Sequence, residues 1–357
     1  MGRGLDKPLL LTTVALVVMG LVVIYSAGQT DVPTFVEDIW KRQLVMLGVG
    51  LAAAVLLFRT SPRLLEWTTP SIYAIAMLLL GLTLLVGTGA GTAAGTRSWL
   101  AVAGMRIGQP AELAKIATIL MLARHLGSKR EAPRGATELF PAALMVGIPF
   151  VLIGLQPDLG SAIVFLGVLF STLFWVGVSG WWLLLLASPL VSLLLAFSTV
   201  SWGAWIVVLT LVLLWVRPYV FEGLFIWLAN VTMGVIALDL WRNLAPYQQN
   251  RLLSFLNPEV DPRATGWHII QSKVAIGSGG LLGKGLLGEE LGFVGVLVAM
   301  ILFVVLLLTL VRIAREATDT FSSVVVFGFT GMLLTHIVVN VGMTVGLMPI
   351  TGIPLPF

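Results

Sequence analysis

Long apolar segments separated by short polar links dominate this sequence and constrain its fold more than any other feature. The chain has 357 residues, of which 58% are hydrophobic and only 11% are charged. A soluble domain carries about 25% charged residues, so this chain has too few charges to cover a surface in water. We therefore predict an integral membrane protein with many spans. The absence of Cys also excludes thiol catalysis and iron–sulfur clusters.

Eleven of these apolar segments are candidate membrane spans. Helices are expected because a helix satisfies its own backbone hydrogen bonds in lipid. The predicted fold class is all-α: a polytopic, multi-span transmembrane helical protein with one large extracytoplasmic loop at about 241–289, treated as a single domain over 1–357. The predicted spans are 9–27, 43–58, 71–87, 110–124, 139–155, 159–177, 181–198, 203–216, 219–240, 290–311 and 322–347.

The basic residues predict the topology. With a cytoplasmic N-terminus, the inside links are short and rich in Lys and Arg, as the positive-inside rule expects. The net charge of +4 is therefore interpreted as a topology signal, and no nucleic-acid partner is expected. The outside segment 241–289 departs from the rule, and this predicts an anionic partner there. Its basic residues are Arg242, Arg251, Arg263, Lys273 and Lys284.

Asp261 is the main candidate for catalysis. Pro258 and Pro262 restrict the backbone around it, so the carboxylate would sit on a stiff, non-helical segment at the outer face. A carboxylate held near a hydroxyl in a dry site can act as a general base. The alternative is a common Asp-Pro turn in which Asp261 only caps the backbone.

The glycine-rich run 277–285 is a candidate phosphate cradle. Its backbone N–H groups could approach a phosphate closely, and Lys284 would add a positive charge. The run is not a P-loop, because Ser278 and Gly285 stand where that motif needs Gly and Ser or Thr. The alternative is a flexible loop that joins two elements.

A third candidate is the segment 109–115. Pro110 suits the first position of a helix, which places Glu112 in the first turn and Lys115 one turn later on the same face. Charges within a membrane are costly, so the two are expected to pair or to face a cavity. A structural ion pair and a functional pair both remain open.

Two outer segments flank the predicted helices. Arg97 could bind phosphate, whereas Trp99 is best explained as an interfacial anchor. Asp158, in a turn between two spans, is predicted to cap the helix that follows it. Asn340 is predicted to form hydrogen bonds between helices and so to hold them together.

Taken in order along the chain, these motifs resemble the SEDS family (shape, elongation, division and sporulation), and within it the elongation branch typified by RodA rather than the division branch typified by FtsW. The resemblance spans nearly the whole chain. The residues that carry it are Arg97-Ser98-Trp99, Gln109-Pro110 with Glu112 and Lys115, Gln156 to Gly160, Tyr247-Gln248 with Arg251, Pro258 with Asp261-Pro262, Gly266 to Lys273, Ile276 to Gly285, and Asn340 to Met343 with Pro349, Gly352 and Pro354.

The resemblance implies a peptidoglycan glycosyltransferase that polymerises lipid II into a nascent glycan strand, beside a class B penicillin-binding protein that supplies the transpeptidase. It implies a multi-pass protein of the bacterial cytoplasmic membrane with its active site on the extracytoplasmic face. The family's essential acidic residue matches Asp261, which we assign as catalytic. The residues assigned to substrate binding are Arg97, Trp99, Glu112, Lys115, Arg251, Lys273, Ser278, Gly279 and Lys284.

The sequence also departs from the family pattern. After Leu287 it passes directly to Gly288, where family members usually carry a further outside stretch, and it reaches Phe357 before the expected Ser-Tyr-Gly-Gly motif and last helix. We expect that these family segments lie outside the sequence given. The region 181–240 contains three predicted spans where the family has one, an even insertion that preserves topology.

Two other functions fit the same physical features. A flippase for a lipid-linked precursor would also need many spans and charges in the membrane, although the polarity of this chain lies mainly in one outer loop. A membrane scaffold that only recruits the penicillin-binding protein is the third. No cofactor is required by the sequence. A divalent metal such as Mg²⁺ stays open, because diphosphate leaving groups often use it, yet no dedicated carboxylate cluster is visible.

Overall fold

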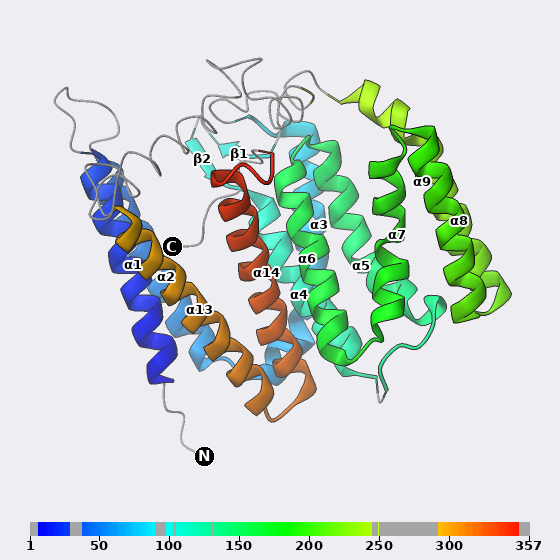
Figure 1. The fold of residues 1–357 in the computed structure, drawn as a ribbon. Helices are drawn as coiled ribbons and strands as arrows, with labels where there is room; N and C mark the ends of the chain where they lie inside the picture. Colours follow the sequence, from blue (N-terminus) through cyan, green and yellow to red (C-terminus); the bar gives the residue numbers. More distant parts are fainter. Residues whose placement is uncertain are drawn as a thin grey trace. The chain divides into compact units, whose positions relative to one another are not determined.

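The computed structural model describes residues 6–28, 38–89, 98–102, 105–129, 131–244, 249 and 292–349 (Figure 1). Within these residues the chain is helical apart from one short β-hairpin. The elements are α1 (Lys7–Gly28), α2 (Ile39–Arg59), α3 (Pro62–Val86), β1 (Leu100–Val102), β2 (Met105–Gly108), α4 (Pro110–Gly127), α5 (Ala136–Leu155), α6 (Leu159–Val176), α7 (Gly180–Leu195), α8 (Thr199–Val216), α9 (Val220–Asn243), α13 (Gly292–Glu316) and α14 (Thr320–Thr344).

Each predicted span corresponds to a helix of the described residues. Nine of these helices are long and apolar enough to cross a membrane. The two others are α7, which is short, and α4, which carries Glu112, Lys115 and Arg124. The prediction of an all-α, polytopic membrane protein is therefore confirmed. The large outer loop lies mostly outside the described residues, and the single-domain assignment stays a prediction.

Two local features were not predicted. The third helix begins at Pro62 and continues through Pro70, whereas the sequence placed its start at residue 71. The hairpin of β1 and β2 precedes α4, with Leu100 paired to Gly108 and Val102 to Met105. Both features lie at the ends of apolar spans. Hydropathy locates the apolar core of a span, but it does not show how far the helix extends beyond that core or whether a short hairpin follows it.

Capping residues account for several helix starts. The carboxylate of Asp158 accepts a hydrogen bond from the Ser161 N–H at 3.1 Å and so caps α6, as predicted. Ser198 and Asp319 cap α8 and α14 in the same way. Gly177 ends α6 in the left-handed region at φ +94°, which a residue without Cβ adopts at little cost.

The described residues divide into two compact units. The first comprises residues 1–69 and 253–357. In it α1 packs against α2 and α13, and α13 packs against α14. Its apolar core is built on Leu16, Phe303, Leu306 and Ile337. Asn340 in α14 donates to the carbonyl of His336 in its own helix at 2.9 Å, so its described bond lies within one helix rather than between two.

The second unit comprises residues 70–252 and contains the candidate site. Helix α4 packs against α5 and α6, and α5 packs against α6. Eleven of the eighteen residues of α4 are buried, including Ala111, Ala114, Ala117 and Ala123, so this helix is enclosed by its neighbours. Small side chains on several faces let the other helices approach closely, as is common in membrane bundles.

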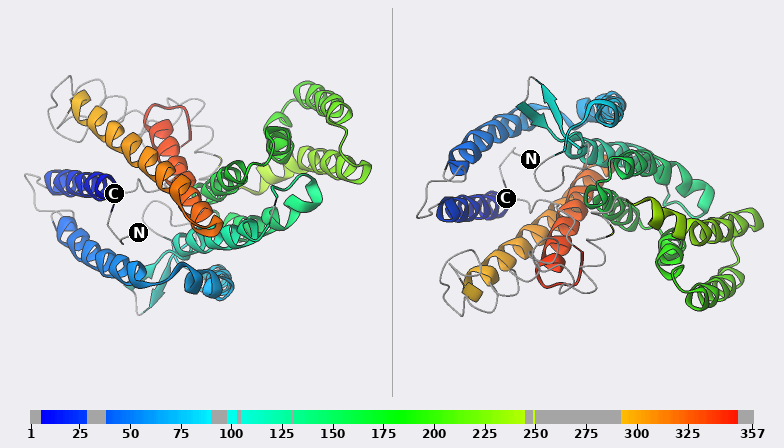
Figure 2. Two further views of the ribbon diagram at one scale, coloured as in Figure 1. Left: turned by 90° about the horizontal axis from the view of Figure 1, so that it is seen from below. Right: turned by 90° about the horizontal axis from the view of Figure 1, so that it is seen from above.

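Helices α7, α8 and α9 form a group of their own within the second unit. They pack pairwise and lie side by side in both views of Figure 2. A buried polar network joins them, centred on the fully buried amide of Asn230. Its Nδ2 donates to Ser188 Oγ at 2.8 Å, and its Oδ1 accepts from Trp205 Nε1 at 3.2 Å. Ser192 Oγ bonds the Asn230 carbonyl at 2.7 Å, so each of the three helices contributes a partner.

Candidate functional site

The ends of four elements meet around the start of α4 in the second unit. The segment after α3 pairs with Trp99, since Thr88 N–H donates to the Trp99 carbonyl at 2.9 Å and Trp99 N–H donates back at 3.1 Å. The hairpin then leads into Pro110 at the first position of α4. The turn between α5 and α6 lies beside it, as the hydrogen bonds below establish. This end of the unit therefore gathers three of the motifs singled out in the sequence.

Glu112 and Lys115 form the ion pair that their spacing predicted. Lys115 Nζ lies 2.8 Å from Glu112 Oε1. The lysine side chain is fully buried, whereas the Glu112 side chain is 47% exposed. The pair thus presents its carboxylate at the surface of the unit and keeps its ammonium inside. An exposed acid beside a buried cation suits a hydroxyl-rich ligand better than a bare anion.

Gln109 and Asp158 come from separate motifs and touch across the helices. Gln109 Nε2 donates to Asp158 Oδ2 at 2.9 Å. The sequence predicts a local role for Asp158 alone, as a helix cap. No spacing rule links two side chains 49 residues apart, so this contact could not be predicted.

Gln156 anchors the same turn to α3. Its side chain is 1% exposed, and its Nε2 donates to Thr83 Oγ1 at 2.7 Å and to the Leu80 carbonyl at 3.0 Å. Its Oε1 is buried without a hydrogen-bond partner, and so is Ser98 Oγ. Buried polar atoms are nearly always paired, with protein or with bound molecules. Two unpaired atoms on segments next to the start of α4 are consistent with a site that binds a polar ligand or water.

Of the site residues assigned from the sequence, Trp99, Glu112 and Lys115 fall in the described residues. Trp99 is half-buried and held by its backbone pairing with Thr88. The remaining assigned residues lie outside the described part of the chain. They are Arg97, Arg251, Asp261, Lys273, Ser278, Gly279 and Lys284.

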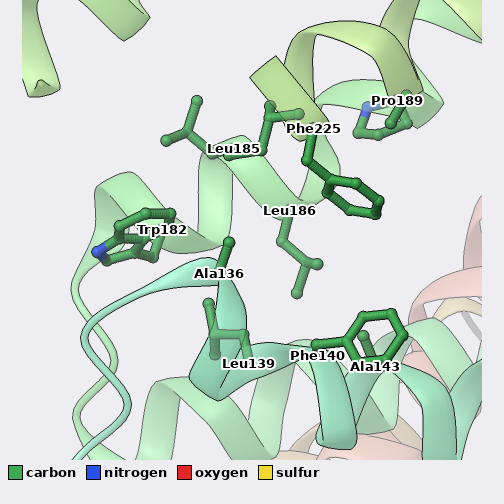
Figure 3. A pocket seen from close by; sticks show the side chains of 11 residues that line it. Ala136, Leu139, Phe140, Ala143, Trp182, Leu185, Leu186, Pro189 and Phe225 are labelled. Carbon is green, nitrogen blue, oxygen red and sulfur yellow. The ribbon is translucent and has the colours of Figure 1, made fainter. Parts of the chain in front are cut away.

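A second feature of this unit is a cavity of about 90 Å³ between α5, α7 and α9 (Figure 3). Phe140, Trp182 and Phe225 are among the side chains around it, and its lining is apolar. A cavity of this kind can hold hydrocarbon but offers no partner for a sugar or a diphosphate. The cavity is therefore not the candidate site.

Metal binding finds no support in the described part of the chain. No three His, Asp or Glu side chains come together there in a way that could hold an ion. The charged pair at the start of α4 has a single carboxylate, a number compatible with Mg²⁺, which usually takes one or two carboxylates together with substrate phosphates, so the metal requirement stays open.

Comparison with known proteins identifies the family. The sequence profile of the FtsW, RodA and SpoVE proteins, described as "Cell cycle protein", matches residues 7–218, 190–287 and 286–357. The chain belongs to this family. The SEDS resemblance drawn from the motifs is therefore confirmed.

Relatives in the family match along nearly the whole chain. The peptidoglycan glycosyltransferase MrdB of Escherichia coli strain K12 is 31% identical over 99% of this chain and 87% of its own length. The peptidoglycan glycosyltransferase RodA of Treponema pallidum is 32% identical over 98% of this chain and 92% of its own. The stage V sporulation protein E of Bacillus subtilis is 32% identical over 99% and 90%.

Solved structures of the family share the fold. One chain from a structure entitled "Structural coordination of polymerization and crosslinking by a peptidoglycan synthase complex" has a TM-score of 0.72 and 30% identity, over 98% of this chain and 90% of its own. The rod shape determining protein RodA of Thermus thermophilus has a TM-score of 0.63 and 27% identity, over 98% and 88%.

The match also bears on the predicted departures from the family. Its last two segments join at residues 286–287, where the sequence analysis expects a family stretch to be missing. The alignment with MrdB extends over 375 residues, more than the 357 of this chain, so the relative carries residues that this chain lacks. The first two matched segments of the family profile, 7–218 and 190–287, overlap at residues 190–218. This overlap falls in the region 181–240, where α7, α8 and α9 occupy the place of the one span that the family pattern predicts.

Proposed function

We infer that this chain is a peptidoglycan glycosyltransferase, a lipid II polymerase of cell-wall elongation and rod-shape maintenance. The observation that carries this conclusion is the similarity to peptidoglycan glycosyltransferases at 31–32% identity over nearly the full length of the chain. The fold of a chain from a peptidoglycan synthase complex supports it independently. The many apolar helices suit a substrate with a polyprenyl tail, because such a tail stays in the bilayer.

The proposed reaction is an inverting glycosyl transfer. Asp261 removes the proton of the 4-hydroxyl of the acceptor N-acetylglucosamine on lipid II. The hydroxyl oxygen attacks C1 of the N-acetylmuramic acid at the end of the growing strand. The C1–O bond to the lipid diphosphate breaks, and polyprenyl diphosphate leaves with the electron pair. A general base near the hydroxyl and cations near the departing charge both lower the barrier.

The remaining assigned residues would hold the two substrates. The loop cations Arg251, Lys273 and Lys284 supply charge for a diphosphate, and the glycine-rich run supplies N–H donors. The Glu112–Lys115 pair has one exposed carboxylate, which can accept hydrogen bonds from sugar hydroxyls.

The protein is a multi-pass membrane protein, and the basic residues favour one orientation in the bacterial cytoplasmic membrane. The adjoining ends of α2 and α3 carry Arg59 and Arg63, and the α8–α9 link carries Arg217. The last turns of α4 and α13 carry Arg124 and Arg315. These positions alternate with the hairpin and the α5–α6 turn along the chain. The positive-inside rule then places the N-terminus in the cytoplasm and the start of α4 on the outer face.

A transpeptidase partner would complete the synthesis of the wall. A solved relative belongs to a complex that coordinates polymerization and crosslinking. By analogy, the partner of this chain would be a class B penicillin-binding protein.

Purified protein and fluorescent lipid II test the proposal. We expect glycan strands on a gel with the protein alone or with the class B partner, and none in an Asp261→Ala variant. A flippase would instead move lipid II across a vesicle membrane without polymerising it. A scaffold would give no glycan strands by itself, and any strands seen with the partner would come from the partner's own activity. Strands that depend on the partner's activity alone would overturn the proposal.

A further inference from the structure

Asp158 makes more hydrogen bonds than a helix cap requires. Its Oδ1 accepts from the Ser161 N–H at 3.1 Å, which is the ordinary capping bond of α6. Its Oδ2 accepts from Ser161 Oγ at 2.9 Å and also from Gln109 Nε2 at 2.9 Å. Two of the three donors belong to α6, and the third comes from Gln109, the residue just before α4.

Gln109 is correspondingly turned away from its own helix. It is the N-cap residue of α4, with φ −105° and ψ 108°, and its side chain makes no capping bond there. The following Pro110 favours this extended backbone, because proline disfavours the helical region for the residue before it. The amide is therefore free to bond Asp158, and this bond joins the first turns of two helices.

The turn that carries Asp158 is itself fixed. Gln156, two residues earlier, is buried and donates to the Leu80 carbonyl and to Thr83 Oγ1 of α3. A bond from Gln109 to Asp158 therefore ties the start of α4 to an anchored point. A bond to a mobile turn would restrain α4 much less.

Glu112 is the side chain that this restraint affects most. Its N–H donates to the Gln109 carbonyl at 3.0 Å, so it lies one hydrogen bond away from the Gln109–Asp158 contact. The body of α4 is held by buried side chains on several faces, but the first turn of any helix lacks part of its backbone hydrogen bonding. Glu112 is half-exposed in that first turn and so depends on what fixes the turn.

We propose that Gln109 and Asp158 are positioning residues for glycosyl transfer: their hydrogen bond fixes the first turn of α4 and thereby the carboxylate of Glu112 against the sugar substrate. This proposal rests on the proposed function. Catalysis is sensitive to placement, and an error of about 1 Å costs up to about 100-fold in rate.

Matched single variants separate positioning from simple capping. Gln109→Leu removes the bond between helices, and Ser161→Ala removes one bond to the same Asp158 oxygen within α6. Lipid II polymerisation is measured as kcat and KM, together with thermal unfolding in detergent. We expect Gln109→Leu to lower kcat about 10- to 100-fold with a small change in KM, and Ser161→Ala to retain most of the turnover.

An exchange of donor and acceptor gives the decisive control. Gln109→Glu places two carboxylates together and should lower kcat, whereas in Asp158→Asn the Gln109 amide can turn its oxygen toward the new N–H group and keep a hydrogen bond. Combined, the two substitutions restore a hydrogen bond with reversed polarity, and we expect kcat to recover at least tenfold over the worse single variant.

Several results would overturn the proposal. The proposal is wrong if Gln109→Leu has the kcat of the wild type. It is also wrong if Ser161→Ala loses as much kcat as Gln109→Leu. Failure of the double exchange to recover kcat, with a folded protein, would indicate that Asp158 acts on substrate directly. If all variants lost stability and activity in parallel, the contact would be structural only. Wild-type protein that made no glycan would instead refute the proposed function itself.

Discussion

The ion pair of α4 gives a prediction whose size follows from burial. Lys115 Nζ and Glu112 Oε1 are 2.8 Å apart, and only the carboxylate side is exposed, at 47%. At an effective dielectric constant of about 20, two charges at this distance attract by about 6 kcal/mol. Solvent around Glu112 reduces that value, and breaking a buried pair by removing one partner costs about 3–5 kcal/mol. We take about 3 kcal/mol for the loss of the Glu112 charge.

The two single substitutions should therefore have unequal effects. Glu112→Gln removes the carboxylate charge that lies 2.8 Å from the buried ammonium of Lys115 and should destabilise the protein by about 3 kcal/mol. Lys115→Met leaves a carboxylate that water can solvate, near the favourable N-terminal end of a helix, and should cost about 1 kcal/mol or less. The double variant should be more stable than Glu112→Gln alone, because the buried ammonium is absent from it.

Unfolding by SDS in mixed micelles measures these free energies, and lipid II polymerisation measures function in parallel. A functional pair predicts that the double variant is stable but inactive, whereas a purely structural pair predicts that stability and activity recover together. The reasoning from burial would be refuted if Lys115→Met destabilised the protein as much as Glu112→Gln.

Three further substitutions test the packing of the second unit. Gly234→Ala would drive a Cβ into the indole of Trp202 and should cost about 1–3 kcal/mol, whereas Gly203→Ala, with open space around it, should be neutral or stabilise α8; thermal unfolding compares the two. Asn230→Leu removes two bonds between helices and should cost about 1–3 kcal/mol, measured by SDS unfolding; a change below about 0.5 kcal/mol would show that the network adds little. Gly135→Ala would place a Cβ 2.7 Å from Glu222 Oε1 and should lower the melting temperature. Adding Glu222→Ala to the same chain should restore part of that loss. An unchanged melting temperature in Gly135→Ala would contradict the contact.

The helices could be predicted from the sequence because one physical constraint decides them. A segment such as 159–177 is too apolar for water and must satisfy its backbone in lipid, and it forms α6 from Leu159 to Val176. Local rules also worked where donor and acceptor are close in sequence. The cap at Asp158 and the pairing of Glu112 with Lys115 are both of this kind.

The rest depends on contacts between distant residues. Gln109 and Asp158, or Gln156 and Thr83, meet only because helices pack side by side, and no periodicity in the sequence specifies that packing. The hairpin before α4 was missed for a different reason: its strands are three and four residues long, too short for an alternating pattern to stand out. Asp261 remains a prediction from the motif and from its two prolines.

Release of polyprenyl diphosphate tests the central claim most directly. The bond between C1 of the donor sugar and the lipid diphosphate breaks each time a glycosyl group is transferred. Purified protein is incubated with lipid II, and released diphosphate lipid is quantified against disaccharide units joined. The account predicts a constant ratio near one, and release at background level in Asp261→Ala. Release that continued undiminished in Asp261→Ala, or wild-type protein that released none, would contradict it.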